Sequence, residues 1–256
     1  MRNVGGYASN CIITHNRGAG SAIQVWTGST AEYCVVKNNS GGNQTAGCYV
    51  PGGVVRNSLI CNNNTNLDAS ASGVAIVNYD SGLVENCVIS NNYGFSYGSG
   101  VKLRIGTLRN CLLIANTGAA AIQSYDASVK VVENCTIASN DKGINFTTST
   151  LVLNTIVQSN TLDVVASTVS YFTNCNVNAT GLSGSGNINT NPAWVDPANY
   201  NFRLTASSLC IDAGMQAAWM TGAKDLDGYS RIDRFSQRVD MGCYEFLRRG
   251  TIFSGR

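Results

Sequence analysis

Short apolar segments recur along most of this chain, and Gly, Asn and Ser residues separate them. The clearest segment is an Asn or Tyr, then a small residue, then mostly aliphatic residues, and it occurs eight times. The copies begin at Asn10, Tyr33, Asn57, Asn86, Asn110, Asn134, Asn154 and Asn174. The intervals between these positions are 23, 24, 29, 24, 24, 20 and 20 residues. Internal repeats of this length indicate a solenoid.

Each repeat resembles three short strands rather than helices. In one repeat, residues 73–77, 82–85 and 87–90 are runs rich in Val and Ile. No window sustains a helical period with caps, and the Leu framework of leucine-rich repeats is absent. Crossover connections between parallel strands are right-handed in nearly all proteins. We therefore predict an all-β fold, a single-stranded right-handed parallel β-helix of three-stranded turns over residues 1–178.

Stacking of successive turns explains the recurring Cys and Asn residues. Turns of such a solenoid lie about 4.8 Å apart, so equivalent residues form ladders. Cys87, Cys111 and Cys135 then have Cβ atoms too far apart for disulfides, and we expect buried free thiols. The sequence leaves open whether Cys210 and Cys243, which lie outside this ladder, form a disulfide. The Asn residues that follow the strands can bond to one another through their amides: Asn16, Asn39, Asn63, Asn92, Asn116, Asn140 and Asn160.

The repeat fades after residue 178, and residues 179–256 are expected to form the last turns, a loop and a capping segment of the same domain. An open solenoid exposes unpaired backbone at its last turn and needs a cover. Charged residues of this segment can form ion pairs that fix the cover: Asp225, Asp227, Arg231, Asp233, Asp240 and Glu245. The alternative is a calcium loop at residues 225–228. An EF-hand would need Glu at its twelfth position, where Ser236 stands.

Four motifs of this segment carry a resemblance to a known family. They are NPAWVDPANYNFRL at 191–204, SLCIDAG at 208–214, DLDGYSRI at 225–232 and VDMGCYEF at 239–246. They resemble the pattern NPxFxDPxxxDFRLxxxSPCIDAG followed by DLDGxxRxxxxxVDIGAYE. That pattern belongs to bacterial surface or secreted parallel β-helix proteins of the pectate-lyase-like superfamily, of the choice-of-anchor Q type. The chain departs from it at Trp194, Asn201, Leu209 and 241–243, and no cell-wall anchor follows Phe246.

The resemblance implies an extracellular or cell-envelope setting but no particular activity. The chain opens directly on repeat-like sequence without a leader, so we expect a trimmed chain, with further domains N-terminal to Met1 as one possibility.

Composition narrows the classes of partner. Only 12% of residues are charged and the net charge is +2, which argues against a nucleic-acid partner. No run of about 18 apolar residues predicts a membrane span. His15 is the only His in the sequence, which excludes catalytic mechanisms that need two His side chains. No C-x-x-C pair or dense acid cluster predicts a metal site; calcium stays open without a clear ligand set.

Period-two alternation in the first strand of each turn predicts which residues face outward. Interior positions are assigned to Ile23/Val25, Cys48/Val50, Val74/Ile76, Val101/Leu103, Ile122/Ser124 and Ile144/Phe146. Outward positions and the adjoining turns then supply candidate substrate-binding residues: Trp26, Tyr49, Tyr79, Lys102, Arg104, Gln123 and Tyr125. Aromatic rings stack on sugar faces, and a Lys/Arg pair can hold uronate carboxylates.

Candidate catalytic residues lie on the same face. Lys102 or Arg104 is the candidate base of a polysaccharide lyase. Asp80 and Asp126, two turns apart, are the candidate carboxylate pair of a glycosidase. The alternative without a catalytic role is that these residues form an ordinary solvated face.

Three functions stay open at this point. The first is a glycan-binding or adhesive solenoid at the cell surface, which fits the resemblance and the low charge. The second is a polysaccharide lyase or glycoside hydrolase that acts on an extended, uronate-containing glycan. The third is a phage tail-spike or structural spacer.

Overall fold

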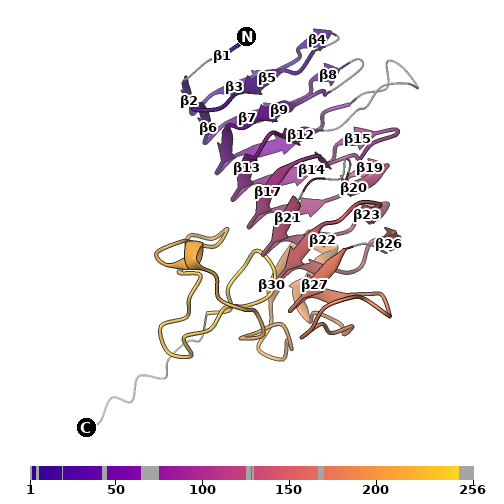
Figure 1. Cartoon of the computed structure of the whole chain (residues 1–256), viewed down its shortest axis with the longest axis vertical. Coiled ribbons are helices and arrows are strands. Elements are labelled where there is room, and N and C mark those ends of the chain that lie inside the picture. The colour runs from indigo at the N-terminus through magenta and orange to yellow at the C-terminus, as the bar shows by residue number, and fades with distance from the viewer. Residues whose placement is uncertain are drawn as a thin grey trace.

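The chain winds into a solenoid in which every turn adds one strand to each of three sheets (Figure 1). The computed structural model describes residues 2–3, 6–18, 20–41, 45–64, 75–124, 128, 130–166 and 170–247. Each sheet has eight strands, and the strands within it pair in parallel. The predicted parallel β-helix is therefore confirmed.

The three sheets follow one another along each turn. The first contains β1 (Arg2–Asn3), β5 (Ile23–Val25), β9 (Cys48–Pro51), β12 (Ile76–Tyr79), β16 (Val101–Leu103), β20 (Ala120–Ser124), β23 (Lys142–Phe146) and β26 (Leu162–Ala166). The second contains β2 (Tyr7–Ser9), β6 (Thr30–Glu32), β10 (Val54–Arg56), β13 (Gly82–Glu85), β17 (Gly106–Arg109), β21 (Lys130–Glu133), β24 (Leu151–Leu153) and β27 (Tyr171–Thr173). The third contains β3 (Ile12–Thr14), β7 (Val35–Lys37), β11 (Leu59–Cys61), β14 (Val88–Ser90), β18 (Leu112–Ile114), β22 (Thr136–Ala138), β25 (Ile156–Val157) and β28 (Asn176–Val177).

The remaining elements are short. Three two-stranded pairs are β4 (Arg17–Gly18) with β8 (Ser40–Gly41), β15 (Tyr93–Gly94) with β19 (Thr117–Gly118), and antiparallel β29 (Trp194–Asp196) with β30 (Asn201–Leu204). The 3₁₀ helices are η1 (Pro197–Asn199) and η2 (Ala218–Met220). Among the described residues, no helix is long and apolar enough to cross a membrane.

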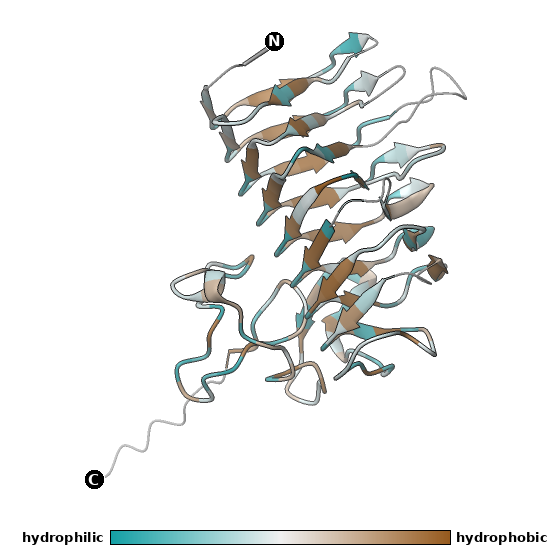
Figure 2. Cartoon of the chain, in the orientation of Figure 1, coloured by the Kyte–Doolittle hydropathy of each residue, from teal (hydrophilic) through white to brown (hydrophobic). Residues whose placement is uncertain are grey.

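The interior of the solenoid holds one apolar core that includes the Cys ladder. The strands that enclose this core are largely hydrophobic (Figure 2). Cys87, Cys111 and Cys135 are fully buried, and the thiol of Cys111 neighbours both of the others. All ten cysteines are free, and nine are buried. The expectation of buried free thiols is thus confirmed for Cys87, Cys111 and Cys135, whereas Cys11 is exposed. Cys210 and Cys243 form no disulfide. Burial raises the pKa of Cys243 to about 12, so that thiol stays protonated.

The register of the first sheet differs from the prediction in one turn. Ile76 pairs with Cys48 and Asn78 with Val50, so Ile76 and Asn78 are the inward pair, not Val74 and Ile76. Asn78 is fully buried, and its Nδ2 donates to the Thr107 carbonyl at 3.0 Å. An inward Asn breaks the apolar pattern, so period-two counting misplaced this strand by two residues. Val74 lies outside the described residues.

The Asn residues that follow the third-sheet strands form a ladder of hydrogen bonds, the post-strand Asn ladder. Each Nδ2 donates to the Oδ1 of the next Asn at 2.8–3.0 Å, from Asn16 to Asn160. The same Oδ1 also accepts the backbone N–H of the preceding Asn, as Asn92 does from Asn63 at 3.0 Å. Asp163 ends the ladder by accepting both the backbone N–H and the amide of Asn160. The predicted Asn-to-Asn bonding is confirmed here.

A second Asn ladder runs along the corner between the second and third sheets. This corner Asn ladder comprises Asn57, Asn86, Asn110, Asn134, Asn154 and Asn174, all with φ between 48° and 52°. Asn tolerates this left-handed backbone better than other non-Gly residues, which explains its recurrence one position before each Cys, Ser or Thr. Asn86 donates to Asn57 at 3.2 Å and Asn110 to Asn86 at 2.6 Å.

The C-terminal segment first completes the solenoid and then turns along its side. Residues 183–188 add an irregular coil on β27 and β28, with single parallel bridges at Ser183 and Ile188. Residues 194–247 then cover the outer face of the lower third sheet (Figure 1). There Trp194, Phe202 and Met241 pack with apolar residues that face outward from the strands: Leu112, Ile114, Ala138 and Ile156. The segment expected as a cover over the last turn thus lies mainly beside the sheet.

The expected ion pairs are partly present in this segment. Arg231 is fully buried and its Nη2 lies 3.0 Å from Glu245 Oε1, while Arg203 lies 2.5 Å from Asp227. Asp225 and Asp240 instead accept backbone N–H groups: Asp225 from residues 227, 229 and 245, and Asp240 from 212 and 246. The side chains therefore tie distant loops of the segment together.

Substitution of one rung tests the post-strand Asn ladder. Asn92→Ala removes the acceptor of two Asn63 donors and the donor to the Ile60 carbonyl, all buried. We expect the free energy of unfolding to fall by about 3 kcal/mol or more, because buried polar groups lose their partners. Urea denaturation measures this. Asn145→Ala, on the outer face of β23, is the control and should change stability by less than about 0.5 kcal/mol.

The buried carboxyls predict a pH dependence of stability. Burial raises the pKa of Asp240 from 3.8 to about 6 and of Glu245 from 4.5 to about 9, and it outweighs the Arg231 guanidinium, which lowers both values. The folded chain therefore binds protons more tightly than the unfolded chain. The stabilisation is complete below about pH 4 and is lost as the pH rises through about 6 and 9.

We expect Glu245→Gln to flatten the upper part of this decrease, because an amide does not ionise. Urea denaturation at a series of pH values measures the effect, with Asp80→Asn, an exposed carboxyl, as the control. A slope that Glu245→Gln leaves unchanged would contradict the assignment.

Candidate functional site

The outer face of the first sheet brings most of the predicted binding residues together. One file of outward side chains consists of Gln24, Tyr49, Val77, Lys102, Gln123 and Asn145, aligned by the strand register. Tyr79 pairs with Pro51 in the next file. Gln123 thus sits where expected, next to Lys102. Tyr125 and Asp126 lie outside the described residues.

Three rings and a guanidinium form a continuous row from the residue after β5, through β9 and β12, to the residue after β16. We call Trp26, Tyr49, Tyr79 and Arg104 the aromatic row. The Trp26 and Tyr49 ring centres are 6.1 Å apart at 81°, and those of Tyr49 and Tyr79 are 6.3 Å apart. Arg104 Cζ lies 4.2 Å from the Tyr79 ring centre. All four residues are partly exposed, so the row is an accessible platform.

The polar edges of the row are held in place. Trp26 Nε1 donates to Gln24 Oε1 at 3.2 Å, which orients the indole. Burial raises the pKa of the Tyr49 phenol, nearby Tyr79 and Asp80 raise it further, and Arg104 opposes them. The Tyr49 hydroxyl therefore stays protonated at neutral pH and can donate a hydrogen bond.

Lys102 does not belong to a solvated face. Its side chain is buried, with 8% exposed, and its Nζ lies 4.2 Å from the Tyr97 ring centre. A general base needs contact with the proton that it removes. Tyr97 covers this ammonium, so Arg104 is the more accessible cation of the predicted pair. Sequence reasoning missed Tyr97 because it lies in the loop between β15 and β16.

The predicted catalytic carboxylates are not brought together by any described contact. Asp80 is exposed, with φ 47°, in the turn after β12. Its proposed partner Asp126 is outside the described residues, so the pair stays a prediction. Over the described part of the chain, no three His, Cys, Asp or Glu side chains are grouped to hold a metal ion.

The second sheet carries a charge ladder that sequence reasoning did not predict. Glu32, Arg56, Glu85, Arg109 and Glu133 occupy one outward position in five successive turns. The paired atoms lie 2.5 Å apart for Arg56–Glu32, 3.6 Å for Arg109–Glu85 and 2.7 Å for Arg109–Glu133. The signal was present in the sequence, since each of these residues immediately precedes the repeated Asn or Tyr.

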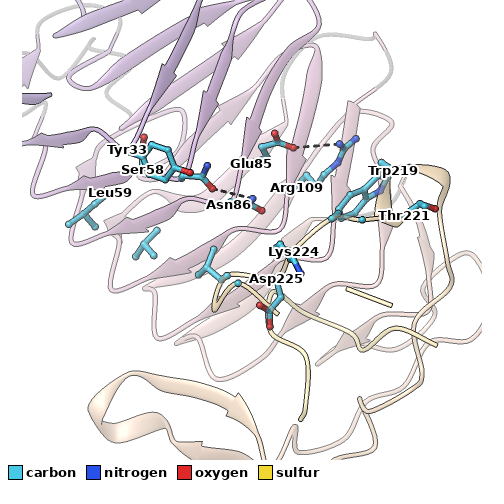
Figure 3. Close-up of a pocket in the computed structure, with 16 residues that line it drawn as sticks. Tyr33, Ser58, Leu59, Glu85, Asn86, Arg109, Trp219, Thr221, Lys224 and Asp225 are labelled. Atoms are coloured by element: carbon cyan, nitrogen blue, oxygen red, sulfur yellow. Dashed lines mark hydrogen bonds and ion pairs between the residues drawn. The ribbon is translucent and has the colours of Figure 1, made fainter. Parts of the chain in front are cut away.

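A cleft of about 830 Å³ lies beside this charge ladder, and the C-terminal segment forms one of its walls (Figure 3). We call it the arm cleft. The other wall is the corner Asn ladder with Tyr33 and Leu59. Trp219 anchors the C-terminal segment to the second sheet. Arg109 Cζ stacks 4.3 Å from the Trp219 ring, and Trp219 Nε1 donates to Glu133 at 2.9 Å. The cleft joins parts of the chain far apart in sequence, which explains why the repeat pattern did not reveal it.

Comparison with known proteins identifies the family. Residues 1–162 match the family model described as "Right handed beta helix region". The chain belongs to the right-handed β-helix family. A search of curated proteins found no match. Among solved structures, this β-helix is similar to pectate lyase Pel9A, with 13% identity, a TM-score of 0.49, and coverage of 85% of this chain and 72% of that chain.

Proposed function

We propose that this β-helix binds an extended polysaccharide along the aromatic row. The observation that carries the proposal is the unbroken contact from Trp26 through Tyr49 and Tyr79 to Arg104. The row crosses four strands and spans about 14 Å, because neighbouring strands lie about 4.8 Å apart. Rings at this spacing can each contact one sugar residue of an extended chain, because sugar rings have apolar faces.

The Arg104 guanidinium gives the row a preference among glycans. A planar guanidinium can bind a carboxylate through two parallel hydrogen bonds. We therefore propose a glycan that carries carboxylates, such as a polyuronate. An extracellular or cell-envelope location would bring the chain into contact with such polymers, and the resemblance of residues 191–246 supports that setting. The choice-of-anchor Q type and a bacterial source stay predictions.

Binding fits the site better than catalysis. A lyase needs an accessible base, and the Lys102 ammonium is covered by Tyr97. Arg104 is committed to the face of Tyr79, and a guanidinium has no acceptor atom that could take a proton from a substrate. We therefore propose adhesion or glycan binding as the function and keep lyase or hydrolase activity as the alternative.

Binding measurements on the intact chain test this proposal. We expect polygalacturonate and alginate to bind and neutral xylan to bind more weakly, as measured by affinity electrophoresis. Tyr49→Ala should weaken binding of every ligand at least tenfold, since it breaks the row at its centre. Arg104→Gln should weaken only the acidic ligands and remove their salt dependence. Tyr171→Ala, an exposed Tyr on the second sheet, is the matched control.

Two outcomes would overturn the proposal. One is no binding across the panel. The other is binding that Tyr49→Ala leaves intact. Release of reducing ends or of unsaturated uronates during the same incubations would assign the face to catalysis instead.

A further inference from the structure

The lower part of the corner Asn ladder binds polypeptide backbone. Each of its four lower Asn side chains donates an N–H to a backbone carbonyl of the C-terminal segment. The pairs are Asn110 with Lys224 at 2.9 Å, Asn134 with Asp240 at 3.2 Å, Asn154 with Met215 at 2.8 Å and Asn174 with Ala213 at 2.8 Å. Because Ala213 and Met215 reach neighbouring rungs, the ladder spacing accommodates alternate carbonyls of one chain.

The upper rungs of the same ladder leave this bonding incomplete. Asn110 and Asn154 each donate one N–H to the Asn of the turn above and the other to a segment carbonyl. Asn86 donates one N–H to Asn57 at 3.2 Å, and its second N–H has no partner among the described residues. The Asn57 amide likewise donates to no described residue. Both side chains line the arm cleft, so the cleft presents the donors that hold backbone carbonyls on the rungs below (Figure 3).

The apolar surface beside these donors continues the interface that the C-terminal segment covers. Leu112 is buried under that segment, and Val88, one turn above, is partly buried against the same cluster. Leu59 comes next in register and is 36% exposed. Leu226 joins the cluster from the segment side and also lines the cleft. An occupant of the cleft would therefore meet the same combination of apolar side chains and amide donors as the segment does.

One charge of the cleft is available to an occupant. The Arg109 guanidinium lies between the carboxylates of Glu85 and Glu133. The buried Asp225 carboxylate accepts three backbone N–H groups. Lys224, by contrast, is exposed and makes no ion pair with any residue that the structure describes. Its ammonium can pair with a carboxylate that enters the cleft.

We propose that the arm cleft binds an extended peptide of another polypeptide chain. Alternate carbonyls of the peptide accept the N–H groups of Asn86 and Asn57. Aliphatic side chains of the peptide pack on Leu59 and Val88, and one carboxylate pairs with Lys224. Main-chain hydrogen bonds supply affinity in such recognition, and the side-chain contacts supply specificity. The site lies on the second and third sheets, so it is independent of the aromatic row on the first sheet.

The ends of the cleft set the length of the peptide. At one end Asn110 is already occupied by the Lys224 carbonyl. At the other end Tyr33 takes the place of an Asn in the turn above Asn57, away from Trp219 (Figure 3). These three steps of the ladder span about 14 Å, which corresponds to about four extended residues.

Binding of labelled hexapeptides to the full chain, followed by fluorescence anisotropy, tests the proposal. The three probes carry aliphatic residues at alternate positions and either Asp, Ser or Lys at one position between them. We expect the Asp peptide to bind most tightly and the Lys peptide least. Lys224→Gln should remove an advantage of about threefold of the Asp peptide over the Ser peptide. Lys142→Gln, an exposed lysine on the first sheet, is the control and should preserve that advantage.

Two further variants test the donors and the apolar contact with the Ser peptide. Asn57→Asp keeps an acceptor for Asn86 and removes the N–H donor, so binding should weaken about tenfold. Asn10→Asp adds the same charge at an exposed Asn of the same corner with φ 54°, and should change nothing. Leu59→Asp should abolish binding. Leu151→Asp, at a side chain that is 38% exposed on the second sheet, should not.

Four results would overturn the proposal. The first is no binding of any of the three peptides, and the second is binding that Asn57→Asp and Leu59→Asp leave intact. The third is loss of peptide binding in Tyr49→Ala, which would place the peptides on the aromatic row. The fourth is displacement of the Ser peptide by xylan oligosaccharides, which would assign the arm cleft to glycans.

Discussion

Hydrogen bonds that run along the solenoid axis hold the buried polar groups of this protein. In the post-strand Asn ladder, each amide donates one N–H to the Asn of the next turn and the other to a backbone carbonyl of the previous turn. A buried amide without a partner costs free energy comparable to a lost hydrogen bond or more. The ladder is therefore stable only as a continuous array with a terminator. Asp163 serves as that terminator, since its carboxylate accepts from Asn160 and also from the Asn178 amide at 2.9 Å.

Periodicity made most of the solenoid predictable. The strand positions, the Cys ladder and the Asn ladders follow from the spacing of residue types, because each turn places equivalent residues in equivalent surroundings. The prediction was wrong where a turn broke that rule. Asn78 occupies an interior position that other turns fill with Val, Leu, Ser or Phe, and it is tolerated because it bonds to the Thr107 carbonyl.

The candidate site was predictable in composition but not in accessibility. Trp26, Tyr49 and Arg104 were chosen from alternation and Tyr79 from the adjoining turn, and the structure brings all four into contact. The burial of Lys102 depends on a loop residue that alternation does not describe. The position of the C-terminal segment depends on contacts such as that of Thr136 with Cys243, 107 residues apart, which no local pattern encodes.

The charge ladder of the second sheet constrains how the number of turns can change. Glu32, Arg56, Glu85, Arg109 and Glu133 alternate in sign at every step. Deletion of the single turn that carries Arg109 would place Glu85 directly beside Glu133, and like charges in that position repel. Deletion of two neighbouring turns would restore the alternation. Along this face, a change in the number of turns therefore keeps the charges paired only when two neighbouring turns are added or removed together.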